Sequence, residues 1–237
     1  MTNYLIFGGS RGLGAMFSHA LPKTGDTVWL VSRSEPDLTA ADGVRRLWIQ
    51  ADLTQRGVGT VIAEKIGDGV VDVCLYNAGI WEQYAFSDAY DFEQVPEDEN
   101  ERIIRVNLLS AINGVQKLLP ALRRSANGKI IFIGANAGLE NAKRPEVATA
   151  ASKFALRGLT HALREIVRKD GIGVTCLNLG DVGTVAQVDG GWTILPNDSG
   201  RVMIDPADIV ILLRAVIALS KASIVKEIDL LGMAEPI

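Results

Sequence analysis

The chain has 237 residues, of which 48% are hydrophobic and 22% charged, and its net charge at pH 7 is -4. This composition is typical of a folded soluble protein, and the length suits one large domain covering residues 1–237. Because there is no basic excess, we expect no nucleic-acid partner. No charged leader precedes the first apolar run, and no apolar stretch reaches the roughly 18 residues that a membrane span needs, so we expect a cytoplasmic protein without a membrane partner.

Short apolar runs alternate with longer segments of helical period along the chain. The runs are Tyr4 to Phe7, Thr27 to Val31, Arg46 to Ile49, Val71 to Leu75, Lys129 to Ile133, Val174 to Asn178 and Ile224 to Leu230. The helical segments are Gly12 to Leu21, Gln55 to Ile66, Glu97 to Arg124, Val147 to Lys169 and Pro206 to Leu219. This alternation predicts an α/β fold, a doubly wound seven-stranded parallel sheet with helices on both faces.

Two stretches do not fit the alternation. The acidic residues from Asp88 to Glu101 predict a solvated loop leading into a helix rather than a metal site. The segment from Asp181 to Asp205 contains Gly190 and Pro196 and is too broken for a regular element, which predicts a lid-like insertion. It follows the carboxyl end of a strand, where open α/β sheets bind their ligands.

The two cysteines and two histidines show no pattern of metal or redox chemistry. Cys74 and Cys176 each lie inside an apolar run, far from one another, which predicts buried core thiols. His19 and His161 fall at helical positions without acidic or Ser neighbours, so we expect structural roles for both. No metal site is predicted.

A glycine-rich turn, Gly8-Gly9-Ser10-Arg11-Gly12-Leu13-Gly14, joins the first strand to the first helix. Free backbone N–H groups and the positive end of the helix dipole favour an anion there, and glycine lets the anion approach the backbone closely. A tight turn without a ligand would have a similar sequence. In this strand-to-helix context, however, the turn is typical of a Rossmann-type site for a dinucleotide pyrophosphate.

Further motifs follow in order along the chain. They are Ala51-Asp52-Leu53 after the third strand, Asn77-Ala78-Gly79 after the fourth, Asn107 in a helix, Ala151-Ser152-Lys153-Phe154-Ala155, and Asn178-Leu179-Gly180-Asp181-Val182-Gly183-Thr184. Together with the glycine turn, this series resembles the short-chain dehydrogenase/reductase family over essentially the whole chain. Two departures are Phe7 where the family has Thr and Leu179 where it has Pro.

The resemblance implies a set of cofactor-binding residues. They are Gly8, Ser10, Arg11, Gly12, Leu13, Gly14, Asp52, Leu53, Asn77, Ala78, Gly79, Lys153, Gly180, Val182 and Thr184. The second strand is followed by Arg33 rather than the acidic residue that usually holds the ribose of NAD. Arg33 and Arg11 would suit a 2′-phosphate, so NADP(H) is the predicted cofactor. The alternative is that both are solvated surface arginines.

The family's usual proton-transfer residues are missing. Relatives transfer hydride to or from a small carbonyl or hydroxyl compound, using a Tyr four residues before the active-site Lys and a Ser about thirteen residues before that Tyr. Here Thr149 stands four residues before Lys153. Alignment on Gly138 places Ala135 at the Ser position, whereas counting back thirteen residues from Thr149 places Asn136 there. An aliphatic alcohol is a much weaker acid than a phenol, whose pKa is about 10.

Three functions therefore remain open. The first is an atypical oxidoreductase in which Lys153 through water, Asp181, Tyr84 or the substrate itself supplies the proton, with Asn136 hydrogen-bonding the substrate oxygen. The second is a catalytically impaired NADP(H)-binding partner subunit or cofactor sensor, and the third is a non-redox lyase or isomerase. In relatives the Lys also binds the cofactor and the Asn also shapes its helix, so the presence of Lys153 and Asn107 does not decide between these three functions. The resemblance further implies a homodimer or homotetramer, or a hetero-oligomer with a competent relative.

Overall fold

The fold is built on a parallel sheet whose strands follow the predicted apolar runs. The computed structural model describes residues 1–140, 143–188, 191–195 and 203–235. Seven strands lie in the order β3-β2-β1-β4-β5-β6-β9, and every neighbouring pair is parallel. They are β1 Asn3–Phe7, β2 Thr27–Ser32, β3 Arg45–Gln50, β4 Val73–Tyr76, β5 Lys129–Ile133, β6 Gly173–Leu179 and β9 Glu227–Leu230. The predicted fold class is confirmed, and the order reverses between β1 and β4, where doubly wound sheets bind dinucleotides.

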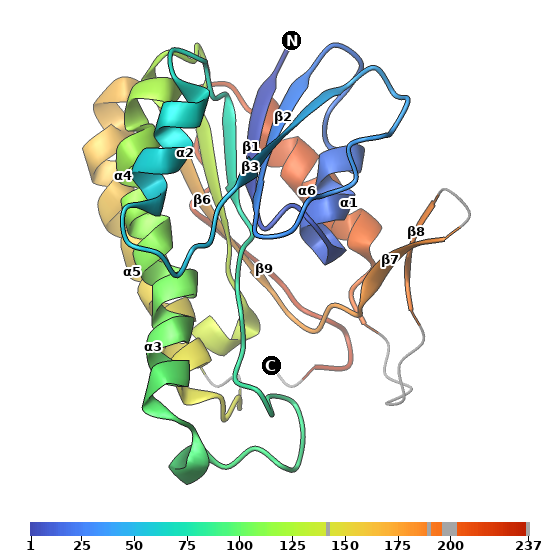
Figure 1. The fold of residues 1–237 in the computed structure, drawn as a ribbon, viewed down its shortest axis with the longest axis vertical. Helices are drawn as coiled ribbons and strands as arrows, with labels where there is room; N and C mark the ends of the chain where they lie inside the picture. The colour runs from blue at the N-terminus through green and yellow to red at the C-terminus, as the bar shows by residue number, and fades with distance from the viewer. Residues whose placement is uncertain (141–142, 189–190, 196–202, 236–237) are drawn as a thin grey trace.

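Helices cover both faces of this sheet (Figure 1). On one face lie α2 Val58–Ile66, α4 Ser110–Arg123 and α5 Val147–Val167, and on the other lie α1 Gly12–Ala20 and α6 Pro206–Ala218. Two buried apolar clusters fill the layers. Because side chains alternate along a strand, Phe7 packs into the first cluster while its neighbour Ile6 packs into the second.

The helix predicted from Glu97 to Arg124 is interrupted. It consists of α3 Glu97–Ile104, a π-helical turn η2 Arg105–Leu109, and α4. A π turn inserts one extra residue per turn, which periodicity does not reveal, and such turns often occur at functional sites. Asn107 lies within it, so the interruption coincides with a predicted site residue.

The segment predicted to be an irregular lid contains regular structure, which corrects that expectation. Strands β7 Val185–Val188 and β8 Gly191–Ile194 pair antiparallel beside α1 (Figure 1). The rings of His19 and Trp192 lie 5.7 Å apart and attach the hairpin to α1. The glycines and the proline around the two short runs gave no sign in the sequence that these runs pair. Residues 189–190 and 196–202, including Gly190 and Pro196, lie outside the described residues.

Burial supports some of the smaller expectations and corrects another. Cys74 and Cys176 are both fully buried, as predicted. Most of the acidic stretch is exposed, but Glu99 is buried, and its carboxylate accepts a 2.5 Å hydrogen bond from the Gln83 amide. Within the described ranges, no helix combines the length and apolarity required to cross a bilayer.

Candidate active site

The glycine turn after β1 leaves room for a ligand against its backbone. A Cβ at Gly14 would lie 2.0 Å from the carbonyl oxygen of Gly8, so the turn closes only with glycine at this position. Gly12 has a φ of +55° and no protein atom within 4 Å of the place its Cβ would take. Open space therefore faces the first turn of α1, where unpaired N–H groups suit a pyrophosphate.

A cleft of about 340 Å³ extends from this turn along the carboxyl ends of β2 and β3. Ten predicted cofactor residues line it: Gly8, Ser10, Arg11, Gly12, Arg33, Asp52, Leu53, Asn77, Ala78 and Gly79. Gly14 lies beneath the turn instead, where it permits the close packing described above. Arg102 of α3 also lines the cleft, a residue that the sequence analysis did not identify. The residues present fit a dinucleotide.

The charged side chains at this cleft differ in whether they have hydrogen-bond partners. The guanidinium groups of Arg11 and Arg33 are exposed, and neither makes a hydrogen bond or ion pair with another described residue. The Asp52 carboxylate, by contrast, accepts hydrogen bonds from the Thr54 amide at 2.9 Å and the Thr54 hydroxyl at 2.8 Å. These hydrogen bonds, with the nearby charge of Arg33, lower the pKa of Asp52. Two cations are thus available beside a carboxylate that is already held by its own turn.

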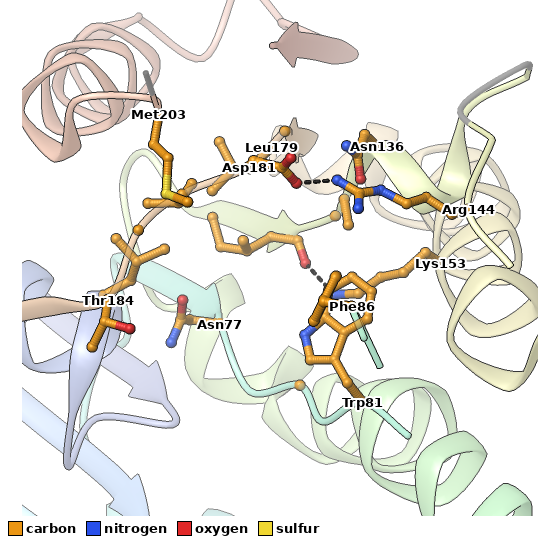
Figure 2. Close-up of a pocket in the computed structure, with 18 of the residues that line it drawn as sticks. Asn77, Trp81, Phe86, Asn136, Arg144, Lys153, Leu179, Asp181, Thr184 and Met203 are labelled. Carbon is orange, nitrogen blue, oxygen red and sulfur yellow. Dashed lines mark hydrogen bonds and ion pairs between the residues drawn. The ribbon is translucent and has the colours of Figure 1, made fainter. Parts of the chain in front are cut away.

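A second cavity of about 670 Å³ continues from the first, since Asn77 and Gly79 line both. Figure 2 shows it at the carboxyl ends of the strands, with Asn77, Thr184 and Met203 on one side and Trp81, Phe86 and Arg144 on the other. The remaining predicted cofactor residues line this second cavity: Leu13, Lys153, Gly180, Val182 and Thr184. The predicted cofactor residues other than Gly14 thus line two adjoining cavities.

Lys153 lines the second cavity beside Gly79, which lines both cavities. Its Nζ donates a 3.0 Å hydrogen bond to the carbonyl oxygen of Ile133 and would lie 3.5 Å from a Cβ at Gly79. Burial lowers the pKa of Lys153 to about 8, because desolvation disfavours the charged ammonium. A buried ammonium with this pKa can release or take a proton near neutral pH.

Asn107 does not face the cavity but organises the loop above it. Its Oδ1 accepts a 2.8 Å hydrogen bond from the Ile80 amide, and its Nδ2 donates to the Ile80 carbonyl at 2.9 Å and to the Ser152 hydroxyl at 3.0 Å. The π turn places this side chain between the end of β4 and helix α5. Asn107 therefore has a structural role in bringing Gly79 and Lys153 together.

Thr149 is fully buried and does not line the cavity. Its hydroxyl donates a 2.6 Å hydrogen bond to Glu82, whose carboxylate also accepts from the backbone amides of Ala148 and Thr149. Glu82 thereby caps the first turn of α5, where N–H groups have no partner within the helix and a negative charge is favoured. The hydroxyl at the family's tyrosine position is therefore committed to Glu82.

The two residues at the predicted Ser position differ in what they offer. Ala135 and Asn136 both line the cavity, and only Asn136 carries polar atoms on its side chain. Its Nδ2 donates a 2.8 Å hydrogen bond to Glu235, near the end of the chain. In Figure 2 Asn136 lies above the cavity beside Arg144.

Arg144 reaches into the cavity and forms an ion pair with Asp181 (Figure 2). Its guanidinium also lies 5.5 Å from the centre of the Phe86 ring, which packs 4.6 Å from the Trp81 ring. Asp181, one of the proton donors considered from the sequence, is thus paired with a cation. Tyr84, a further candidate donor, is 55% exposed and does not line this cavity.

Comparison with known proteins now decides the family. A family model described as short chain dehydrogenase matches residues 2–190. The chain belongs to the short-chain dehydrogenase family. It is 28% identical over 216 residues to an uncharacterized oxidoreductase of Staphylococcus saprophyticus, covering 86% of each chain. It is 31% identical over 177 residues to a rhamnolipids biosynthesis 3-oxoacyl-acyl-carrier-protein reductase of Pseudomonas aeruginosa, covering 69% of this chain and 66% of the relative.

A solved structure extends the likeness over the whole fold. The alcohol dehydrogenase from the archaeon Thermococcus sibiricus, complexed with 5-hydroxy-NADP, aligns with a TM-score of 0.83 at 23% identity and covers 100% of this chain and 99% of its own. At that identity the likeness concerns the fold. The family, together with the cleft described above, makes this short-chain dehydrogenase an oxidoreductase-family protein with a site for a nicotinamide cofactor.

Besides Arg102, three polar residues around the dehydrogenase's candidate site were not identified from the sequence: Glu82, Arg144 and Glu235. Each stands alone in a loop or tail, outside any motif, and each acts on a residue far away along the chain. Only the position of Glu82, five residues after Asn77, carried a signal, because a loop leaving that strand end must pass the pocket. Nothing in the sequence connects Glu235 with Asn136, which lies 99 positions earlier.

Proposed function

We propose that this short-chain dehydrogenase is an NADP(H)-dependent oxidoreductase acting on a small carbonyl or hydroxyl compound, with Lys153 as the proton donor in place of the family's tyrosine. One observation carries the proposal. Lys153 is buried in the cavity that adjoins the cofactor cleft, and its pKa is about 8. Of the groups considered from the sequence, Thr149 and Asp181 are engaged by other residues and Tyr84 lies outside the cavity.

The choice of NADP(H) rests on charge. Arg11 and Arg33 line the cleft without partners among the described residues, and the neighbouring Asp52 is held by Thr54. Guanidinium groups bind phosphate with paired hydrogen bonds, whereas the ribose hydroxyls of NAD are usually held by an acidic side chain. The Thermococcus sibiricus dehydrogenase of the same fold was solved with an NADP derivative, which is consistent with this choice.

The mechanism follows from what the residues around the cavity can do. NADPH held by the cleft residues would supply a hydride to the carbonyl carbon, and the carbonyl oxygen would need a proton. Lys153 holds that proton on Nζ and loses it readily because burial has lowered its pKa. Asn136 offers a neutral polar partner to the oxygen, and the rings of Trp81 and Phe86 exclude water from one wall.

Turnover and binding should be measured separately. We expect the wild-type protein to oxidise NADPH slowly with a panel of small aldehydes and ketones, because a positioned general acid contributes about 10²- to 10⁴-fold and lysine replaces a phenol here. Lys153→Met should abolish this turnover, while Lys153→Arg, which keeps the charge but cannot release a proton, should abolish it without a comparable loss of NADPH binding. Activity that survives Lys153→Arg would contradict the proposed role of Lys153.

A second function is favoured by one observation. The bond between Thr149 and Glu82 withdraws the hydroxyl at the family's tyrosine position from the cavity. A protein so altered could bind NADP(H) as a partner subunit or a cofactor sensor without catalysing a reaction. Tight NADPH binding together with no turnover across the carbonyl panel would support this second function over the first.

We also propose that the protein self-associates through α4 and α5, as the family resemblance implies. These helices and the adjoining π turn expose several large apolar side chains: Leu109, Ile112, Val147, Phe154 and Ile166. Exposed apolar side chains mark an interface where they form a contiguous patch, and we propose that these five side chains do so. Light scattering after size exclusion should give a dimer or tetramer, and Phe154→Glu should shift it toward the 25.5 kDa monomer.

A further inference from the structure

The chain returns to the candidate active site after its last strand. Following β9, a turn is closed by a 2.9 Å hydrogen bond from the Glu235 amide to the Gly232 carbonyl. This turn places the Glu235 side chain at the carboxyl edge of the sheet, beside the residues that follow β5 and β6. No motif of the sequence includes this tail.

The Glu235 carboxylate accepts three hydrogen bonds at this position. Its Oε1 accepts hydrogen bonds from the backbone amides of Asp181 at 2.6 Å and Gly232 at 2.8 Å. Its Oε2 accepts a 2.8 Å hydrogen bond from Asn136 Nδ2. One carboxylate thus connects the segment after β5 with the segment after β6, and hydrogen bonds to a charged acceptor are stronger than neutral ones.

Gly180 provides the space for this carboxylate. A Cβ at Gly180 would lie 2.0 Å from Glu235 Oε1, so any other residue there would displace the side chain. The Gly180 amide in turn donates a 2.8 Å hydrogen bond to the Leu230 carbonyl, which aligns the tail with the end of β6. Gly180 therefore has a second role besides lining the cavity.

We propose that Glu235 is a positioning residue of the active site that acts through Asn136. Asn136 is only 7% exposed and lines the cavity, and it is the polar residue closest to the family's Ser position. Because one N–H of the Asn136 side-chain amide is hydrogen-bonded to Glu235, this amide group is held in one orientation and does not rotate freely. The same carboxylate holds the backbone at Asp181, whose side chain pairs with Arg144.

The kinetic consequence rests on the proposed function. A fixed Asn136 would meet the substrate oxygen without first being ordered, so loss of Glu235 should lower kcat more than it weakens NADPH binding. The free energy of a hydrogen bond to a charged group corresponds to a change in rate of about tenfold or more when that bond is lost. We expect this loss in Glu235→Ala and a smaller one in Glu235→Gln, whose amide oxygen can still accept from one donor.

Controls separate positioning from simple destabilisation of the tail. Met233, in the same turn, is 99% exposed, and Met233→Ala should leave kcat and NADPH affinity unchanged. In an Asn136→Ala background, adding Glu235→Ala should change kcat by less than about twofold, because residues that act through one another are not additive. Fully additive losses would overturn the proposal.

A measurement independent of turnover completes the test. In the ¹H–¹⁵N spectrum of the full chain, the side-chain amide signals of Asn136 are those that disappear in Asn136→Ala. Glu235→Ala should shift this pair and Met233→Ala should not. If the pair stays in place in Glu235→Ala, the proposal is wrong. If it moves while no carbonyl is reduced by the wild type, Glu235 positions Asn136 and the proposed oxidoreductase function fails instead.

Discussion

The Thr149 hydroxyl donates a 2.6 Å hydrogen bond to the Glu82 carboxylate, and both side chains are buried. This pair lies one helical turn before Lys153, at the position where the family resemblance expects a tyrosine. The hydroxyl is therefore part of a cap on α5 rather than a substrate ligand. Its removal should be measurable as a loss of stability.

Thr149→Val should lower the free energy of unfolding by about 1.5 to 3 kcal/mol, because it removes a hydrogen bond to a buried carboxylate without changing the size of the side chain. Urea denaturation followed by circular dichroism would measure this. Thr60→Val, at an exposed position of α2, is the matched control and should lie within about 0.5 kcal/mol of the wild type. Equal stability of the Thr149 variant would argue against the cap.

Thr149→Tyr alone should not restore the family's usual chemistry. Thr149 has no exposed surface, so a phenol must displace Glu82, and overpacking of this kind typically costs about 1 to 3 kcal/mol. Combining it with Glu82→Ala and Ala135→Ser would give the phenol room and a hydroxyl partner. We expect faster NADPH oxidation by the triple variant than by Thr149→Tyr, assayed with the same carbonyl panel. A faster single variant would mean that Glu82 is no obstacle.

Cofactor preference should depend on Arg33 and Arg11. Each substitution to Ala removes a guanidinium group that faces the cleft without another partner in the described structure. We expect Arg33→Ala to weaken NADPH binding about tenfold or more and to leave NADH binding nearly unchanged, since only NADPH carries the 2′-phosphate. Fluorescence titration of both cofactors tests this. Tighter binding of NADH than NADPH by the wild type would refute the assignment.

The pH dependence of turnover should follow Lys153. With a pKa of about 8, the lysine carries its proton below that pH and loses it above. Carbonyl reduction should therefore be constant at lower pH and decline above about pH 8, whereas alcohol oxidation should rise through the same range. Initial rates in both directions between pH 6 and about 10 give the two profiles. Profiles that fall together in both directions would indicate another group.

Lys153 also connects pH with stability. Its pKa is about 8 in the folded chain, whereas the ordinary value for lysine is 10.5, so the unfolded chain binds more protons between these values and stability should rise with pH there. The penalty for burying the ammonium is complete below about pH 8. Lys153→Met should therefore stabilise the cofactor-free protein at pH 7, by up to on the order of 3 kcal/mol, and this advantage should shrink toward pH 10.5.

Gly14→Ala should abolish cofactor binding and destabilise the fold. Its Cβ would lie 2.0 Å from the Gly8 carbonyl oxygen, which forces the glycine turn away from the end of β1. Gly158→Ala is the control, because a Cβ there meets no atom within 4 Å and alanine favours the helix. Calorimetry with NADPH and thermal melts should separate the two. Normal binding by Gly14→Ala would show that the turn tolerates a shift.

The strands and the cofactor side of the site could be predicted because their signals are local. The run from Tyr4 to Phe7 is buried on both faces and reads as continuous apolar sequence, and the glycine turn follows it directly. The π turn at Asn107 and the β7–β8 hairpin could not be predicted, because each depends on packing against α5 or α1 rather than on its own periodicity.

The sequence by itself determined the doubly wound sheet and the dinucleotide cleft. Both are indicated by the periodicity of apolar residues and the spacing of glycines, which involve residues close together along the chain. The side chains around the substrate cavity could be identified only from the tertiary structure, because they come from segments that are far apart in the sequence. Glu82 reaches Thr149 across 67 positions and Glu235 reaches Asn136 across 99. Parallel strands bring their carboxyl ends to one edge of the sheet, so loops that are far apart in the sequence line one pocket. A buried carboxylate in this pocket needs hydrogen-bond donors, and the tertiary structure determines which donors lie within reach.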